Sequence, residues 1–117
     1  MIKVIWLLKR APHLSPAEFR AWWEGHARDV VRHQGPFLSR YVVNFRIPDE
    51  AFSGNAQPSE WDGVAEQWFP DIETYNAWYA RPNSPTRADT LAHTSRFERL
   101  IVEEVEMPLT DDSSGSS

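Results

Sequence analysis

The chain has 117 residues, the size of one domain, and its 41% hydrophobic and 25% charged residues are typical of globular proteins. Twelve basic and 17 acidic side chains give a net charge of −5, which argues against binding to nucleic acid or to an acidic membrane surface. The lack of cysteine excludes disulfides, thiol nucleophiles and zinc–thiolate sites. No apolar run approaches the roughly 20 residues of a membrane span, and the N-terminus lacks a signal-peptide pattern, so we expect a cytoplasmic protein.

The first part of the chain predicts a strand followed by a long helix. Residues 3–9 carry apolar side chains at successive positions, which indicates a strand buried on both faces. Ser15, Pro16 and Glu18 form a capping-box pattern, so a helix begins there and runs to about His33. The apolar stripe of this helix consists of Phe19, Trp22, Trp23, His26, Val30 and His33.

Two further strands and a long loop follow this helix. Residues 40–47 predict a strand on which Tyr41 shares a face with other apolar side chains. Residues 48–60 contain two Pro, a Gly, two Ser and an Asn, which predicts an exposed loop that acts as a lid. Residues 62–69 predict the next strand.

The last third of the chain predicts two short helices and a final strand. Asp71 caps the first of these helices, and Ser84, followed by a proline, caps the second, which runs to about Arg96. Residues 99–107 predict the last strand. We expect one domain over residues 1–110 and a disordered tail over residues 111–117, which are rich in Ser, Asp and Gly.

The order of these elements predicts an α+β fold. Strand, helix, strand, strand, helix, strand is the ferredoxin-like βαββαβ arrangement, with a four-stranded antiparallel sheet. Helices cover only one face of such a sheet, yet Val42 and Trp68 belong to the other face, where they would form an exposed apolar patch. A second copy packed sheet to sheet would cover that patch, so we predict a two-fold homodimer, a dimeric α+β barrel.

His26 is the first candidate for chemistry. An imidazole within an apolar stripe needs hydrogen-bond partners, and histidine exchanges protons near neutral pH. The alternative is a structural histidine bonded to a backbone carbonyl. Six Trp, six Phe and three Tyr leave a similar choice open, between a core of large side chains and a pocket for a flat cyclic molecule.

Three other residues are weaker candidates. Tyr41 has a hydroxyl that suits orienting a carbonyl or stabilising an enolate, or it lies at the edge of the core with that hydroxyl in water. Gln67 is a hydrogen-bonding group if its strand face lines a pocket, and otherwise a solvated amide. His93 is either catalytic or a cation near the end of a helix, where the helix dipole favours it. We interpret His13 and His33 as surface residues.

Several motifs do not occur. The sequence has no Gly-rich phosphate-binding pattern, no His-Glu-x-x-His pattern and no pair of histidines four residues apart. We therefore predict no cofactor and no metal ligands.

Three stretches resemble the EthD family of small dimeric α+β barrel proteins. They are VIWLLKR at residues 4–10 with LSPAEFRAWWEGHA at 14–27, WDGVAEQWF at 61–69, and Arg96-Phe97 with VEE at 102–104. The resemblance implies a ferredoxin-like subunit, a sheet-to-sheet dimer and a pocket between the sheet and the helices. Trp6, Tyr41 and Gln67 would line that pocket, and His26 would enter it from the first helix.

The chain also resembles 4-methylmuconolactone methylisomerases, which have His, Tyr and His at the positions of His26, Tyr41 and His93. They carry Cys where this chain has Gln67. Polyketide cyclases of the same superfamily carry a Tyr–His pair where this chain has Trp78 and Ser84, so that pair is absent.

The resemblance implies a cofactor-independent lyase, isomerase or cyclase that acts on a small cyclic, aromatic or polyketide-like carbonyl substrate. His26, Tyr41 and His93 are the predicted catalytic residues, and the predicted substrate-binding residues are Trp6, Trp22, Trp23, Phe45 and Gln67. Two alternatives stay open. One is a haem-binding or oxygen-dependent barrel with His93 as the haem ligand, and the other is a non-catalytic accessory protein of an oxygenase pathway.

Overall fold

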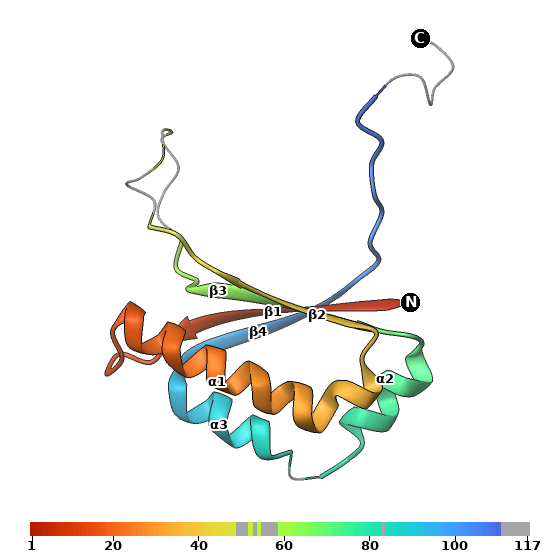
Figure 1. Ribbon diagram of the computed structural model, residues 1–117, viewed down its shortest axis with the longest axis horizontal. Helices are drawn as coiled ribbons and strands as arrows, with labels where there is room; N and C mark the ends of the chain where they lie inside the picture. The colour runs from red at the N-terminus through yellow and green to blue at the C-terminus, as the bar shows by residue number, and fades with distance from the viewer. Residues whose placement is uncertain (49–51, 53, 55–58, 83, 111–117) are drawn as a thin grey trace.

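The computed structural model describes residues 1–48, 52, 54, 59–82 and 84–110. Its strands are β1 (Ile2–Arg10), β2 (Arg40–Phe45), β3 (Gly63–Phe69) and β4 (Thr94–Val102). Its helices are α1 (Pro16–Gln34), the 3₁₀ turn η1 (Gly35–Phe37), α2 (Ile72–Tyr79) and α3 (Pro85–His93). The strands form an antiparallel sheet in the order β2-β3-β1-β4, and the helices of the described chain lie on one face of it (Figure 1). The predicted ferredoxin-like α+β fold is confirmed.

The helices begin where the sequence predicts, for local reasons. The N–H of Glu18 donates to the Ser15 hydroxyl at 3.1 Å, and the N–H of Ser15 donates to the Glu18 carboxylate at 2.8 Å. Asp71 accepts from the N–H of Thr74 at 2.7 Å at the start of α2. Ser84 occupies the cap position of α3, but its hydroxyl makes no capping bond, so that part of the prediction is wrong. Among the described residues, no helix has the length and apolar character that crossing a membrane requires.

The end of the chain differs from the prediction. The last strand spans Thr94–Val102 rather than 99–107, and α3 ends at His93 rather than about Arg96. The partner strand explains the shift, because β4 pairs with β1 from Arg10 opposite Thr94 to Lys3 opposite Val102. β1 begins at Ile2, which lies opposite Glu103, so residues from Glu104 onward have no strand to pair with. The predicted lid at 48–60 and tail at 111–117 fall largely or wholly outside the described residues.

The core lies between the sheet and the helices in two aromatic clusters. One consists of Val4, Phe69, Tyr75 and Trp78, and the other of Leu8, Phe19, Trp23 and Ala65. Both draw on alternate residues of β1 and β3, which point to the helix side of the sheet. The aromatic residues thus serve as core, and the space between the two clusters is where a cavity can form.

The opposite face of the sheet is more polar than predicted. Trp68 is only 6% exposed. Lys3 and Arg40, its neighbours on β1 and β2, each lie 4.6 Å from the centre of its ring, and its indole N–H donates to Glu104 at 2.6 Å. The expectation that Trp68 forms part of an exposed apolar patch is therefore wrong. Leu100 on β4 remains 54% exposed on this face.

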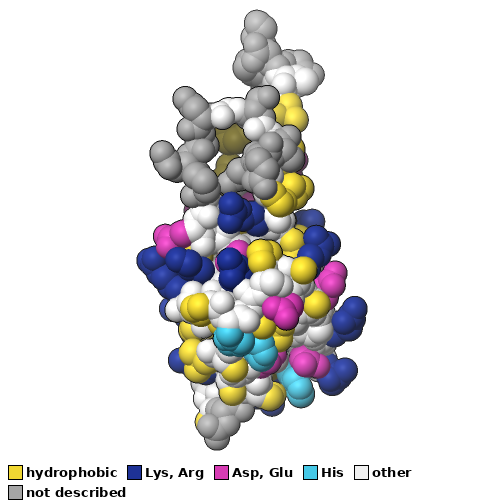
Figure 2. Space-filling view, turned by 90° about the vertical axis from the view of Figure 1, so that its left-hand side faces the viewer, with side chains coloured by type: hydrophobic (Ala, Val, Ile, Leu, Met, Phe, Trp, Pro, Cys, Tyr) yellow, Lys and Arg dark blue, Asp and Glu magenta, His cyan; other side chains and the backbone are white. Residues whose placement is uncertain are grey.

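Charged side chains do not collect in a basic patch on the face seen in Figure 2. Basic, acidic, histidine and hydrophobic side chains are interspersed there, as the net charge of −5 would suggest. This distribution gives no electrostatic support for a nucleic-acid surface on that face.

Gly63 at the start of β3 allows a close approach that no other residue permits. A Cβ at this position would lie 2.4 Å from the ring of Trp23 and 2.6 Å from the backbone oxygen of Asn44. Trp23 is 1% exposed and the Asn44 oxygen is backbone, so neither can move aside cheaply. Gly25 on α1 is the opposite case, because a Cβ there meets nothing within 4 Å.

These two glycines make a matched prediction. We expect Gly63→Ala to lower the free energy of unfolding by about 1–3 kcal/mol through overpacking. Gly25→Ala should raise it by about 1 kcal/mol, because alanine favours a helix over the unfolded chain. Urea denaturation followed by tryptophan fluorescence measures both, and a neutral Gly63→Ala would contradict the packing described here.

Candidate active site

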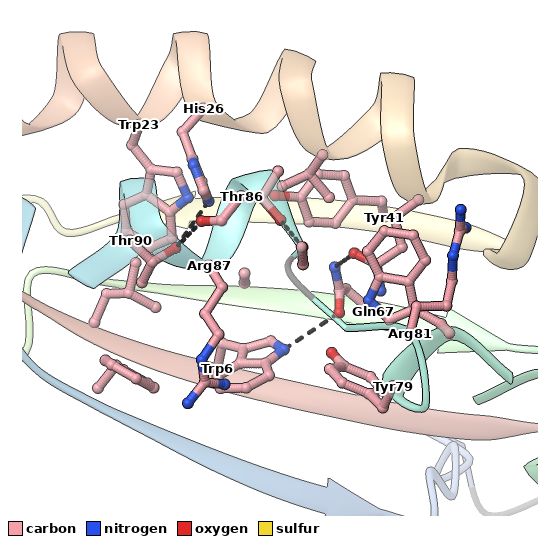
Figure 3. A pocket seen from close by; sticks show the side chains of 17 residues that line it. Trp6, Trp23, His26, Tyr41, Gln67, Tyr79, Arg81, Thr86, Arg87 and Thr90 are labelled. Carbon is pink, nitrogen blue, oxygen red and sulfur yellow. Dashed lines mark hydrogen bonds between the residues drawn. The ribbon is translucent and has the colours of Figure 1, made fainter. Parts of the chain in front are cut away.

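A cavity of about 190 Å³ lies between the sheet and the helices (Figure 3). Its aromatic walls are Trp6, Trp23, Tyr41, Trp78, Tyr79 and Phe97. Its polar lining consists of His26, Gln34, Gln67, Arg81, Ser84, Thr86, Arg87 and Thr90. No aspartate or glutamate belongs to the lining among the described residues. Flat apolar walls with a few convergent polar groups are the usual features of a small-molecule site.

His26 reaches this cavity from the buried stripe of α1 and is 7% exposed. Its Nδ1–H donates to Oδ2 of Asp89 on α3 at 2.7 Å. Its Nε2 lies 3.2 Å from the hydroxyl of Thr90, one residue further along α3. The partner of His26 is therefore a carboxylate, and not the backbone carbonyl expected of a purely structural histidine. With the proton held on Nδ1, Nε2 carries the lone pair in the neutral ring.

Asp89 collects donors from two helices. Besides His26, it accepts from the indole N–H of Trp22 at 3.1 Å and lies 3.2 Å from Nδ1 of His93. Burial alone would raise the pKa of Asp89, but the hydrogen bonds from Trp22 and His26 and the charges of the two histidines together lower it below 3.8. Asp89 is therefore ionised at neutral pH and acts as the anchor of His26.

Trp22 and His93 lie behind this pair rather than in the cavity. The Trp22 ring stacks on His26 at 4.7 Å and on His93 at 4.8 Å between ring centres. Nδ1 of His93 is also 2.8 Å from the backbone oxygen of Asp89. This stack fixes the plane of the His26 ring and holds α1 against α3.

A relay of amide groups crosses the floor of the cavity. The Trp6 indole N–H donates to Oε1 of Gln67 at 3.2 Å, and Nε2 of Gln67 donates to Oε1 of Gln34 at 3.0 Å. Nε2 of Gln34 is buried and makes no hydrogen bond of good geometry to any described residue. An unsatisfied buried donor is costly, which marks this end of the relay as a place where a ligand can bind.

Two phenols complete the polar lining. Burial raises the pKa of Tyr41 to about 12, against a hydrogen bond with Trp23 that lowers it. Burial also raises the pKa of Tyr79 to about 12, in spite of polar contact with Gln34 and Trp6. Both hydroxyls therefore keep their protons at neutral pH and can donate to a ligand oxygen.

The structure brings together five of the eight residues that the sequence singled out. Lining the cavity are Trp6, Trp23, His26, Tyr41 and Gln67. Outside its lining lie Trp22, His93 and Phe45, the last of which packs edge-on against Trp23. The polar atoms of Gln67 bond to other side chains, so it is a link in the relay as well as part of the wall.

Sequence reasoning missed several polar residues of the site. Gln34 lies just beyond the predicted end of the helix at His33 and is not among the predicted site residues, although it follows Val30 by four residues and His26 by eight on the same stripe, which is a signal that could have found it. Asp89, Thr90 and Arg87 come from α3, and no periodicity in the sequence pairs that helix with α1.

No cluster of three or more His, Asp or Glu side chains suited to a metal ion occurs among the residues that the structure describes. The groups present are instead an imidazole–carboxylate pair, amides, phenols, hydroxyls and two guanidinium groups. This set supports proton transfer and the binding of oxygen atoms.

The EthD domain family matches residues 11–92, which is most of the chain. The chain belongs to the EthD family. That stretch holds all eight residues of the polar lining, whereas Trp6, Leu8 and Phe97 of the cavity wall lie outside it. No functionally curated protein matches the sequence.

Solved structures of other proteins share the fold of this EthD-family chain. A protein from Arabidopsis thaliana has a TM-score of 0.69 at 14% identity, over 93% of this chain and 100% of its own. An EthD family protein from Bacillus halodurans has a TM-score of 0.66 at 19% identity, over 90% and 99%. SnoaB from Streptomyces nogalater, a cofactor-independent oxygenase, has a TM-score of 0.62 at 16% identity, over 93% and 97%. Two others, from Bacteroides fragilis and Thermobifida fusca, are described as dimeric.

Asp89→Asn tests the anchor of His26, because it keeps the shape of the side chain and removes its charge. The folded-state pKa of Asp89 is lowered, so its carboxylate stabilises the fold above the ordinary value of 3.8, and that contribution is lost as the pH falls through the lowered value. We expect the variant to lose about 1–2 kcal/mol of unfolding free energy near neutral pH, after discounting for partial exposure.

The difference between the wild type and Asp89→Asn should shrink in strong acid. Urea denaturation over a pH series measures it. Asp29→Asn is the control, since Asp29 forms an exposed pair with Arg32 on α1 and should change little at any pH. A difference in unfolding free energy that does not change with pH would contradict an ionised Asp89.

Proposed function

We propose that this EthD-family protein is a cofactor-independent enzyme that moves a proton on a small cyclic carbonyl compound. The observation that carries the proposal is the His26–Asp89 pair, held at 2.7 Å, with the histidine lining an aromatic cavity. A base positioned by a carboxylate beside a largely apolar space is suited to proton abstraction next to a carbonyl.

The first step is removal of a proton from the carbon next to the carbonyl. Nε2 of His26 forms a bond to that proton, and the electron pair of the broken C–H bond moves into the carbonyl to form an enolate. Asp89 balances the positive charge that the ring acquires. Return of the proton to another carbon completes an isomerisation. Attack of the enolate carbon on a second carbonyl instead gives an alkoxide, which takes the proton back from His26 and completes a cyclisation.

Thr90 provides a hydroxyl that suits both protonation states of His26. Its oxygen lies 3.0 Å from the backbone oxygen of Thr86 as well as 3.2 Å from Nε2. The hydroxyl has one proton, and while it donates that proton to Thr86 the lone pair of neutral Nε2 is free to take the proton of the substrate. Once Nε2 is protonated, the hydroxyl can donate to Thr86 and accept from the ring.

The enolate oxygen needs a hydrogen-bond donor that stays protonated. Tyr41 supplies one, because burial raises its pKa to about 12. The amide of Gln67 adjoins it in the cavity (Figure 3). Trp6 and Trp23 form flat walls, and the volume of about 190 Å³ favours a ligand of one or two rings, since sites for drug-sized ligands span about 300–1,000 Å³.

A cofactor-independent oxygenase is the second candidate. SnoaB, which shares the fold, is one. Its support here is chemical, because the same proton abstraction yields a carbanion that can reduce dioxygen if it is well delocalised. Haem bound through His93 has less support, since Nδ1 of that ring bonds to Asp89 and the ring lies against Trp22 outside the cavity lining.

Solvent exchange tests the proton transfer without knowledge of the natural substrate. We expect the wild type to accelerate deuterium incorporation next to the carbonyl in at least one of a panel of small cyclic ketones and lactones, followed by NMR in D₂O. His26→Gln should lower this acceleration at least about 100-fold, the lower range for general-base catalysis.

His33→Gln is the matched control, because His33 is an exposed residue of the same helix and does not line the cavity. It should leave exchange unchanged. Equal exchange by His26→Gln and wild type would remove His26 from the mechanism and favour an accessory role. Oxygen consumption that accompanies turnover would favour the second candidate.

We also propose that the chain forms a homodimer through the face of the sheet opposite the helices. Some proteins of this fold are dimeric. On that face Leu100 is 54% exposed, and residues 103–110 run away from the sheet on the same side (Figure 1). Val105 and Met107 in that segment are each 69% exposed, which suits contact with a second copy.

Leu100→Glu tests the dimer. A carboxylate in place of this exposed apolar side chain should shift the population toward the monomer in sedimentation equilibrium at micromolar concentration, because burying it in the interface would cost its hydration. Leu91→Glu on α3 is the control, because Leu91 is also 54% exposed but belongs to the helical layer. If the wild type sediments as a monomer, or if both variants behave alike, the sheet is not the interface.

A further inference from the structure

Three hydrogen-bond donors of the cavity lining have no carboxylate partner among the described residues. The guanidinium groups of Arg81 and Arg87 make no ion pair with a carboxylate among the described residues. Nε2 of Gln34 is a third donor, which is buried near the Tyr79 hydroxyl but makes no hydrogen bond of good geometry among the described residues. The described lining contains no aspartate or glutamate, so the side-chain oxygens it offers as acceptors are the neutral ones of tyrosine, serine, threonine and glutamine.

The amide relay fixes the donor character of Gln34. An indole N–H can only donate, so the atom of Gln67 that faces Trp6 must be its oxygen. The nitrogen of Gln67 then faces Gln34, whose oxygen accepts from it. Reversing either amide would set two donors or two acceptors against each other. The relay therefore ends in an N–H group of Gln34, a side chain that is only 3% exposed.

The first turn of α3 adds to the positive character of the cavity. Ser84, Thr86 and Arg87 all line the cavity, and they form the cap and first turn of this nine-residue helix. The Ser84 hydroxyl pairs with that of Thr86 at 2.9 Å instead of capping the helix, and this turn carries no acidic residue. The partial positive charge of the helix N-terminus is left without a neutralising side chain.

The two arginines lie at different ends of the cavity. Arg87 runs down beside Trp6, whereas Arg81 lies toward Tyr79 (Figure 3). The Arg81 guanidinium packs 5.3 Å from the centre of the Trp78 ring, which holds it at the rim. The whole chain carries a net charge of −5, so this local excess of positive groups does not follow from composition.

We propose that the ligand of the cavity is a small cyclic carboxylate, whose carboxylate group binds to Arg87 at the first turn of α3. The planar guanidinium matches a carboxylate with two parallel hydrogen bonds. The ring lies between Trp6 and Trp23, and a second oxygen of the ligand accepts from the Gln34 end of the relay. Arg81 adds a weaker attraction from the other end. The proposal rests on the proposed function in placing the ligand beside His26.

A pair of probes that differ only in charge tests this inference. 4-Oxocyclohexanecarboxylate carries a ring, a ketone and a carboxylate, and 4-oxocyclohexanecarboxamide is its neutral analogue. Each is titrated into the ¹⁵N-labelled full-length protein while the indole N–H signals are followed by NMR. The Trp6 indole is part of the relay, so its signal reports on occupancy of the cavity.

We expect the carboxylate to bind at least tenfold more tightly than the carboxamide and to weaken as the salt concentration rises. Arg87→Gln should remove this preference, and Arg81→Gln should reduce it. Arg28→Gln is the control, since it changes the net charge equally but Arg28 is an exposed residue of α1 outside the cavity lining. Equal affinity for both probes, no saturable binding of the carboxylate, or equal effects of Arg87→Gln and Arg28→Gln would overturn the proposal.

The outcome separates this inference from the proposed proton transfer. His26→Gln should keep the preference for the carboxylate, because Arg87 belongs to a different helix, while losing deuterium exchange. A preference that survives together with unchanged exchange in His26→Gln would leave an anion-binding protein without the proposed chemistry. If His26→Gln loses deuterium exchange but the wild type shows no preference for the carboxylate, the proposed proton transfer stands and the carboxylate ligand is ruled out.

Discussion

The hydrogen bond between His26 and Asp89 is the contact on which the site depends. It joins α1 to α3 across 63 positions of the chain, and because an ionised carboxylate can only accept, it favours the tautomer with the proton on Nδ1 rather than on Nε2. The same carboxylate binds Trp22, so one anion fixes the spacing of the helices, the plane of the imidazole and its tautomer. A cavity between sheet and helices therefore has a polar wall whose geometry is set by the packing that closes the fold.

The orientation of the remaining polar groups of the cavity is set by side chains of the sheet. Trp6 faces the helices from β1, and its indole can only donate, which orients Gln67 and through it Gln34. Proteins rarely bury an unsatisfied donor, because it costs the free energy of its lost hydration. The open end of this relay and the uncapped first turn of α3 are thus two departures from local stability in one cavity, which is typical of a binding site.

The fold was accessible from the sequence, but only part of the site was. Alternating apolar residues and the cap at Ser15 are local signals, and they predicted the elements and the helix on which His26 lies. The partner of His26 depends on α3 lying beside α1, a tertiary contact that no local pattern encodes. The shifted β4 has the same origin, since the start of β1 decides where its partner strand ends. The unexpected cover of Trp68 comes from three residues on three different segments.

The large aromatic content served two purposes that composition could not separate. Trp23 is wholly buried against Gly63, where a single methyl group would collide with it, yet the same ring forms a wall of the cavity. A wall held this tightly cannot collapse into the space beside it, so the cavity persists without a ligand to support it. The same side chains thus form both the core and the wall of the cavity. Because Gly63 has no β-carbon, Trp23 can pack against the sheet and line the cavity at the same time.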